Sequence, residues 1–128
     1  MRRGQPRSRP PFPAVAGLYL APTLINNVET ISTVPKVMEL GGADFAEIGA
    51  PPNSTGSRIF SVSGNVRSGG NFELKLGSTL RELVYDHAGG LEEGRTLKAI
   101  IPGGSSVPVL TADQIDTPLD ADSMAEAG

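Results

Sequence analysis

The stretch of residues 58–76 limits the possible folds most, because its apolar and polar residues alternate in two runs around a glycine pair. A period of two places every second side chain on the same face of a strand. The first run covers residues 58–66 and the second covers residues 71–76, while residues 67–70 (Arg-Ser-Gly-Gly) are typical of a tight turn. A β-hairpin is therefore predicted. The residues expected on its buried face are Phe60, Val62, Phe72, Leu74 and Leu76.

A helix is predicted directly after the hairpin. Thr79 and Glu82 have the spacing of a capping box, in which the hydroxyl and the carboxylate accept hydrogen bonds from free backbone N–H groups. Gly89 and Gly90 end the helical pattern. The residues expected on one face of this helix, at helical spacing, are Leu80, Leu83, Val84 and His87.

Two more strands are expected after this helix. Residues 97–101 form a third apolar run, and residues 107–110 contain a proline, which favours an edge strand. Hairpin, helix and strand around one apolar face is the element order of a β-grasp domain. The predicted fold class is α+β, with a ubiquitin-like β-grasp domain at residues 56–112. Residues 116–128 show no clear core pattern.

The first part of the chain differs in character. Residues 1–25 are rich in proline, which fixes φ and restricts the preceding residue, so an extended arm is expected rather than a helix. A helix is predicted to open at Asn26-Asn27 and to end at Gly41-Gly42, with a kink or short break at Pro35. A second short helix is expected over residues 43–48.

Composition excludes several kinds of chemistry. The chain has no cysteine and one histidine, His87, which excludes disulfides, thiolate nucleophiles and cysteine-ligated zinc or iron–sulfur sites within it. The N-terminus lacks the apolar region of a secretory signal, and no apolar run is long enough to cross a bilayer, so a cytosolic protein is expected. A solvated or partner-facing arm is favoured over a nucleic-acid contact for the early basic residues. These residues are Arg2, Arg3, Arg7 and Arg9.

Three groups of motifs, in this order, resemble the NADH-binding flavoprotein subunit (F type) of respiratory complex I. The first group runs from Arg3-Gly4-Gln5-Pro6-Arg7 through Arg9-Pro10-Pro11-Phe12-Pro13-Ala14 and Gly17-Leu18-Tyr19 to Pro22-Thr23. The second comprises Asn26-Asn27-Val28-Glu29-Thr30 and Val34-Pro35. The third comprises Phe60-Ser61-Val62-Ser63-Gly64, Leu80-Arg81-Glu82-Leu83 and Ile101-Pro102-Gly103-Gly104-Ser105-Ser106-Val107-Pro108. The resemblance covers nearly the whole chain.

The resemblance implies that the chain is an internal fragment of that flavoprotein. Residues 1–55 correspond to the C-terminal portion of the FMN- and NADH-binding domain, and residues 56–112 to the soluble-ligand-binding β-grasp (SLBB) module. Residues 113–128 correspond to a connector toward a helical iron–sulfur domain. The glycine-rich nucleotide loop is expected before Met1, and the cluster-ligating cysteines after Gly128. Leu20 stands where the family commonly has glycine.

The resemblance also implies an activity for the parent flavoprotein. There, NADH gives a hydride to FMN, and electrons then pass singly to iron–sulfur clusters, including a 4Fe-4S cluster whose ligands this chain lacks. The expected partners are the thioredoxin-like 2Fe-2S subunit and the large iron–sulfur subunit of the peripheral arm. The expected location is the cytoplasmic or matrix side of the inner membrane, without insertion. The isolated chain is expected to be inactive.

Four residues are carried over as binding residues. Asn26, Asn27 and Thr30 match positions where the family contacts FMN, and a helix N-terminus suits a phosphate. Without the resemblance, the simpler interpretation is that asparagine caps the helix. Phe12 matches a phenylalanine that stacks on the adenine of NADH; core packing is the interpretation from its own sequence context. No catalytic residue and no metal ligand is expected.

Other motifs carry weaker signals. Residues 102–106 lack the lysine and the following helix of a phosphate-binding P-loop, so a turn is predicted. Glu92-Glu93 is predicted to be a solvated loop. Two alternative functions remain open. One is a stand-alone β-grasp module that binds a small ligand or a protein partner, and the other is the equivalent diaphorase subunit of an NAD-linked hydrogenase or formate dehydrogenase.

Overall fold

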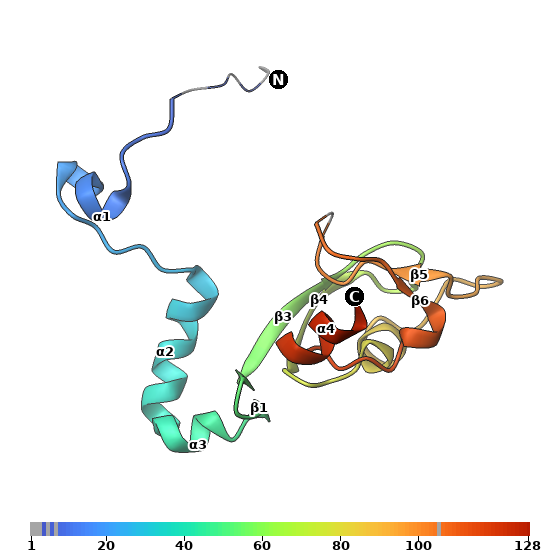
Figure 1. Cartoon of the computed structure of the whole chain (residues 1–128). Helices are drawn as coiled ribbons and strands as arrows, with labels where there is room; N and C mark the ends of the chain where they lie inside the picture. Colours follow the sequence, from blue (N-terminus) through green and yellow to red (C-terminus); the bar gives the residue numbers. More distant parts are fainter. Residues whose placement is uncertain (1–3, 5, 7, 105) are drawn as a thin grey trace. The chain divides into compact units, whose positions relative to one another are not determined.

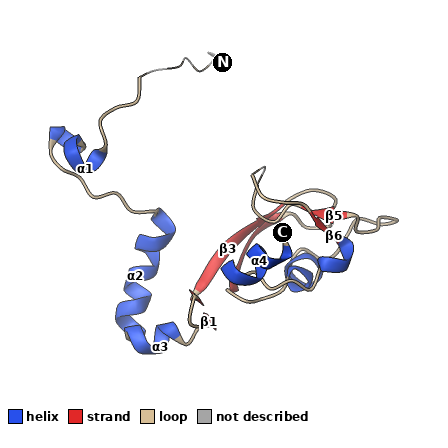
Figure 2. Ribbon diagram, viewed as in Figure 1, coloured by secondary structure: helices blue, strands red, loops and turns tan. Residues whose placement is uncertain are grey.

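A computed structural model describes residues 4, 6, 8–104 and 106–128, so Arg2, Arg3 and Arg7 of the basic arm lie outside the described residues. The chain is a mixed α+β protein that divides into two units, residues 1–36 and 37–128, which are taken separately below (Figures 1 and 2). Every described helix is too short or too polar to span a membrane.

The described part of the first unit contains two short helical segments and the start of a longer helix. These are α1 (Pro13–Ala16), η1 (Leu18–Leu20) and α2 (Val28–Leu40), which continues into the second unit. The expectation of a wholly extended arm up to residue 25 is therefore wrong. The physical reason is that Pro13 occupies the first turn of α1, where its fixed φ suits a helix and its missing N–H is not needed.

Pro35 does not interrupt α2, so of the expected kink or short break the break is absent. The helix runs through this proline from Val28 to Leu40 and ends at Gly41, whose φ of 90° lies in the left-handed region. Only one backbone donor is lost at a proline, and the rest of the ladder can continue around it. The next helix, α3, spans Gly42–Ala46, close to the predicted range.

The predicted hairpin is present, but its turn is longer than expected. Strands β3 (Ser57–Val62) and β4 (Gly70–Lys75) pair antiparallel with Phe60 opposite Phe72. The prediction of a tight turn at residues 67–70 is wrong, because residues 63–69 connect the two strands. Val66 pairs instead with Leu91, and the N–H of Arg67 donates to the carbonyl of Gly90 at 2.9 Å.

The predicted helix begins as expected and then changes its pitch. The N–H of Glu82 donates to Oγ1 of Thr79 at 3.1 Å, which is one half of the capping box. Residues Glu82–His87 form a π-helical segment, η2, with Leu83 and Val84 buried. A π-helical turn contains more residues than an α-helical turn, so a residue seven positions further along no longer lies on the same face of the helix. The His87 side chain is accordingly 39% exposed, with Nε2 3.8 Å from Oε1 of Glu82.

The remaining strands are short. β1 (Gly49–Ala50) pairs with β2 (Ser54–Thr55), and β5 (Ala99–Ile100) pairs antiparallel with β6 (Leu110–Thr111). The strands predicted at 97–101 and 107–110 are thus reduced or shifted. Among the described residues, the strands form three separate two-stranded ladders. The α+β class is confirmed, and the β-grasp topology stays a prediction.

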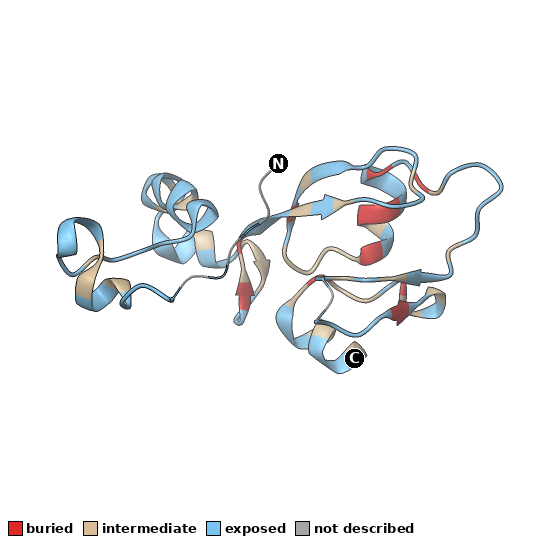
Figure 3. Ribbon diagram, turned by 90° about the horizontal axis from the view of Figure 1, so that it is seen from above, coloured by how far each residue is buried: buried red, intermediate tan, exposed pale blue. Residues whose placement is uncertain are grey.

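The last part of the chain contributes to the core, which corrects the expectation for residues 116–128. Leu119 is buried, together with Ile115 before it. After η3 (Ala112–Gln114), helix α4 (Ala121–Ala127) begins at Asp120, whose Oδ1 accepts from the N–H of Ser123 at 2.8 Å. Figure 3 shows the buried positions of the second unit. The buried cluster comprises Leu74, Leu80, Leu83, Val84, Leu110, Ile115 and Leu119.

An ion pair joins the helix to the segment before Leu119. Nε and Nη2 of Arg81 donate to the two carboxylate oxygens of Asp116 at 2.6 and 2.9 Å. Hydrogen bonds from Arg81 lower the pKa of Asp116 from its ordinary value of 3.8. The pKa of Asp120 is lowered as well, by hydrogen bonds from the backbone and hydroxyl of Ser123.

Core truncation at Leu110 is expected to be costly. Leu110 is 2% exposed, and replacing a buried leucine by alanine removes apolar contacts and leaves a cavity, so Leu110→Ala should lower the free energy of unfolding by about 2–5 kcal/mol. Leu24→Ala is the matched control, since Leu24 is 87% exposed and should change it by less than about 0.5 kcal/mol. Urea unfolding followed by circular dichroism measures both. Equal effects would contradict the described core.

The second unit should lose stability in acid. A carboxyl whose pKa is lower in the folded state stabilises the fold above its unfolded pKa, and this stabilisation disappears as the pH falls through the folded value. For Asp116 and Asp120 the loss of this stabilisation therefore begins near pH 3.8 and continues at lower pH. The melting temperature should fall between about pH 6 and pH 2, and it should fall less in the variant Asp116→Asn. Asp44→Asn on α3, which changes the same charge elsewhere, should leave the slope unchanged.

Candidate functional site

The start of α2 is capped by a side chain of the predicted site. Oδ1 of Asn27 accepts from the N–H of Glu29 at 2.8 Å, and the Asn27 carbonyl accepts from the N–H of Ile31 at 3.0 Å. Asn27 is therefore an N-cap residue, as its sequence context alone predicts. Its amide nitrogen is not used by this cap. Asn26 and Thr30 are exposed on either side of the cap.

Phe12 lies at the entrance to α1 and is not a core residue. Its backbone is extended, and its carbonyl accepts from the N–H groups of Val15 and Ala16 at 2.8 and 3.1 Å. The ring is 67% exposed, so the core packing favoured by its sequence context is wrong. An aromatic ring held on a fixed backbone and open to solvent is suited to stacking on another planar group.

A compact loop follows Phe12 and presents two further apolar residues. The N–H of Thr23 donates to the carbonyl of Pro13 at 2.8 Å, and Oγ1 of Thr23 accepts from the N–H of Leu18 at 2.8 Å. Tyr19 and Leu20 have φ of 55° and 62°, the left-handed region that glycine enters most easily. The glycine that the resemblance implies at the position of Leu20 would adopt this conformation without strain.

The first unit buries none of its described residues. The structure thus places Phe12, Asn26, Asn27 and Thr30 on the surface of one unit. Two cavities in the described part of the chain are lined by other residues, from Arg58 onward. The larger of these cavities belongs entirely to the second unit, and no residue of the predicted site takes part in it.

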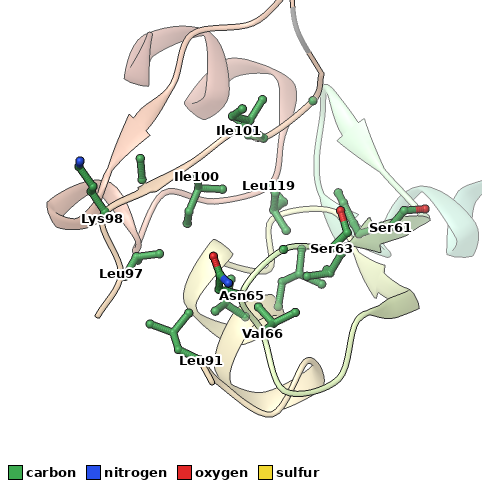
Figure 4. Close-up of a pocket in the computed structure, with 18 of the residues that line it drawn as sticks. Ser61, Ser63, Asn65, Val66, Leu91, Leu97, Lys98, Ile100, Ile101 and Leu119 are labelled. Atoms are coloured by element: carbon green, nitrogen blue, oxygen red, sulfur yellow. The ribbon is translucent and has the colours of Figure 1, made fainter. Parts of the chain in front are cut away.

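The larger cavity has a volume of about 1160 Å³ and lies between two walls (Figure 4). Residues 58–66, from β3 and the loop after it, form one wall, and residues 94–104, around β5, form the other. In Figure 4, Ser61 and Ser63 lie on one side, and Lys98 and Ile101 on the other. Three basic residues line the cavity, namely Arg58, Arg95 and Lys98.

The sequence analysis missed this cavity, although one signal was present. Arg58 has the same parity as Phe60 and Val62 in an alternating strand, which places it on the face that turns inward. Lys98 gave no comparable signal, because β5 is only two residues long. A smaller apolar cavity of about 290 Å³ lies between Val107, Leu110 and Met124.

Other residues considered from the sequence have structural roles. Oε2 of Glu92 lies 3.7 Å from Nε of Arg95 and accepts a hydrogen bond from the Asn65 amide at 3.2 Å. His87 packs beside Phe72 with ring centroids 6.0 Å apart. The described residues contain no cluster of three or more His, Cys, Asp or Glu that could hold a metal ion.

The hairpin, the helix and the short antiparallel ladders define a small α+β domain in the second unit. The model of the SLBB domain family matches residues 58–125, more than half of the chain. The chain belongs to the SLBB domain family.

The comparisons with single proteins extend over both units. The chain is 51% identical over 127 residues to an F-type subunit of NADH-quinone oxidoreductase, the one numbered 2, of Rhizobium meliloti (strain 1021), covering 99% of this chain and 30% of that protein. It is 54% identical over 127 residues to the F-type subunit of Mycobacterium tuberculosis (strain ATCC 25618 / H37Rv), covering 99% of this chain and 28% of the relative. The resemblance to the F-type subunit is confirmed. The chain spans about 30% of the length of these relatives.

A solved structure agrees with the fold. The crystal structure of NAD+-reducing [NiFe]-hydrogenase in the air-oxidized state is similar with a TM-score of 0.71 and 35% sequence identity. The similarity covers 91% of this chain and 20% of the hydrogenase chain.

Removing the cap of α2 should loosen its first turn. Asn27→Ala deletes the acceptor for the Glu29 N–H, and losing an N-cap costs about 1 kcal/mol. Asn27→Asp keeps an acceptor and should preserve the turn. Amide hydrogen exchange at residues 29–32 is the measurement: exchange should speed up in the alanine variant and stay near the original rate in the aspartate variant. Unchanged exchange in both variants would show that the side chain does not hold this helix end.

Proposed function

We propose that the first unit supplies part of the FMN- and NADH-binding region of an NADH-oxidising flavoprotein subunit of the NADH-quinone oxidoreductase type. The observation that carries this proposal is the identity of about half of all positions, over 99% of the chain, to the F-type subunits of two bacteria. The quinone-linked type is favoured over the hydrogenase type because identity to the hydrogenase chain is lower, at 35%. A formate dehydrogenase diaphorase remains a further alternative.

The donors at the start of α2 fit FMN. With Oδ1 of Asn27 engaged by the Glu29 N–H, the amide N–H groups of Asn27 are left to donate to an anionic or hydroxylated ligand. Asn26 and Thr30 add an exposed amide and an exposed hydroxyl. Ribityl hydroxyls and phosphate oxygens accept such bonds, and the helix N-terminus favours negative charge. In this proposal Asn26, Asn27 and Thr30 hold FMN, and bound FMN supplies the redox chemistry of hydride acceptance.

Phe12 is proposed to contact NADH. Its exposed ring would stack on the adenine, so that binding is favoured without any part in proton transfer. None of these four residues is an acid or a base, and their role is to position the two nucleotides.

An iron–sulfur cluster does not fit this chain, which has no cysteine. The 4Fe-4S cluster is therefore assigned to other parts of such a flavoprotein. The proposed division is residues 1–55 for the nucleotide-binding portion, 56–112 for the β-grasp SLBB module and 113–128 for the connector. The proposed partners are the thioredoxin-like 2Fe-2S subunit and the large iron–sulfur subunit, on the cytoplasmic or matrix side of the inner membrane.

A second function is proposed for the SLBB domain alone, namely binding of a small ligand. The cavity of about 1160 Å³ within this domain favours it, since this volume lies just above the range of about 300–1,000 Å³ that is typical of small-molecule sites. This function needs no residue of the first unit.

A chimera tests the flavin proposal. This chain would replace the matching stretch of the Rhizobium meliloti relative, and bound FMN and NADH oxidation with an artificial acceptor would be measured. The chimera should retain FMN, while Asn27→Asp should lower flavin occupancy at least about fivefold, because the capping acceptor is kept but a negative charge faces the phosphate.

The control for this chimera is Asn71→Asp, the same charge change on β4. Its acceptor oxygen would still receive the Ser61 hydroxyl, so folding should be unaffected. Full flavin occupancy in Asn27→Asp, equal to that in Asn71→Asp, would rule out Asn27 as an FMN ligand. Phe12→Ala should raise KM for NADH with FMN retained.

A further inference from the structure

The charged residues of the larger cavity all have one sign. Arg58, Arg95 and Lys98 line it, whereas no aspartate or glutamate appears among its described lining residues. The chain as a whole has the opposite balance, with 14 acidic and 11 basic residues. Positive charge is therefore concentrated at this cavity against the overall charge of the protein, which favours an anionic ligand.

Two of these cations are available to a ligand. Nε of Arg95 lies 3.7 Å from Oε2 of Glu92, so its charge is partly balanced. Arg58 and Lys98 have no carboxylate partner within the part of the chain that the structure describes. They come from opposite walls, since Arg58 lies on β3 and Lys98 directly precedes β5. Each wall therefore offers a cation to an anion bound in the cavity.

Part of the cavity lining is apolar, and polar side chains, among them Ser61, Ser63 and Asn65, form another part. Leu83, Val84 and Leu119 line the cavity and are buried members of the core cluster. Val66 and Leu91, which pair across a β-bridge, add half-buried side chains to the lining. Figure 4 shows Val66, Leu91, Ile100 and Leu119 around the cavity and Lys98 at its edge. The lining therefore combines an apolar part with polar and cationic side chains.

The short strand on one wall argues against a docked peptide strand. β5 consists only of Ala99 and Ile100, and strand addition depends on a row of main-chain hydrogen bonds along an edge. The volume of about 1160 Å³ suits one small molecule that leaves part of itself in solvent. At the β5 wall a small ligand is thus the better fit, and the volume favours it for the cavity as a whole.

We propose that this cavity binds an amphipathic anion, with an apolar chain or ring against the half-buried Val66, Leu91 and Ile100 and a carboxylate or phosphate group at one of the two cations, Arg58 or Lys98. The inference names the ligand class for the second function proposed above and rests on that function. It is independent of the flavin proposal.

Three probes with one apolar chain and different charge test the ligand class. Octanoate, 1-octanol and octylammonium would each be titrated into the 128-residue chain and followed by amide chemical shifts. Octanoate should shift the amides of residues 61–66 and 97–101 and should bind at least about fivefold more tightly than 1-octanol, with octylammonium weakest. Added salt should weaken octanoate binding.

Charge-removing variants test the two cations. The double variant Arg58→Gln, Lys98→Gln should reduce the preference for octanoate over 1-octanol to about twofold or less, whereas the matched double variant Arg9→Gln, Lys75→Gln should retain it. Amide spectra of the unliganded variants show whether each is folded. If the double variant Arg58→Gln, Lys98→Gln does not fold, the titration is repeated with each single variant.

The outcomes separate the two levels of the proposal. Equal binding of octanoate and 1-octanol in the cavity would overturn the anionic class while leaving small-ligand binding by the domain intact. Shifts confined to residues of the first unit, or no saturable binding of any probe, would overturn both.

Discussion

The second unit depends on one small apolar cluster whose members come from distant parts of the sequence. Leu74 lies on the hairpin, Leu80 and Leu83 on the helical segment, and Leu110 and Leu119 near the end of the chain. Burying a leucine side chain contributes about 1.5–3 kcal/mol, so these few residues outweigh the three short ladders, which could not persist in water without them. The bidentate contact of Arg81 with Asp116 then fixes how the helical segment meets the chain that follows.

The first unit has no comparable cluster among its described residues. These residues are exposed or half-buried, and local hydrogen bonds rather than packing determine their conformation: Thr23 closes the loop after Phe12, and Asn27 caps α2. Such a segment is suited to being completed by other protein or ligand surfaces. This accords with a role as one side of a nucleotide site, as proposed from the similarity to the F-type subunits.

Local patterns predicted the elements well where the cause was local. Alternation located the hairpin, the Thr79–Glu82 spacing located the helix start, and Asn27 was recognisable as a cap. The failures have tertiary causes. Val66 leaves the hairpin to pair with Leu91, and Leu119 is buried in a cluster whose members reach back to Leu74. No sequence window contains those contacts. The four site residues were carried over by resemblance, and their part in binding stays a prediction.

The link between the hairpin loop and the end of the helix has a consequence for folding. The N–H groups of Arg67 and Ser68 donate to the carbonyls of Gly90 and Ala88, residues that lie about 20 positions further on. The loop can therefore order only once the helical segment has docked, and the two should open together as one cooperative foldon. Because this loop also forms part of one wall of the larger cavity, opening of that foldon would remove part of that wall.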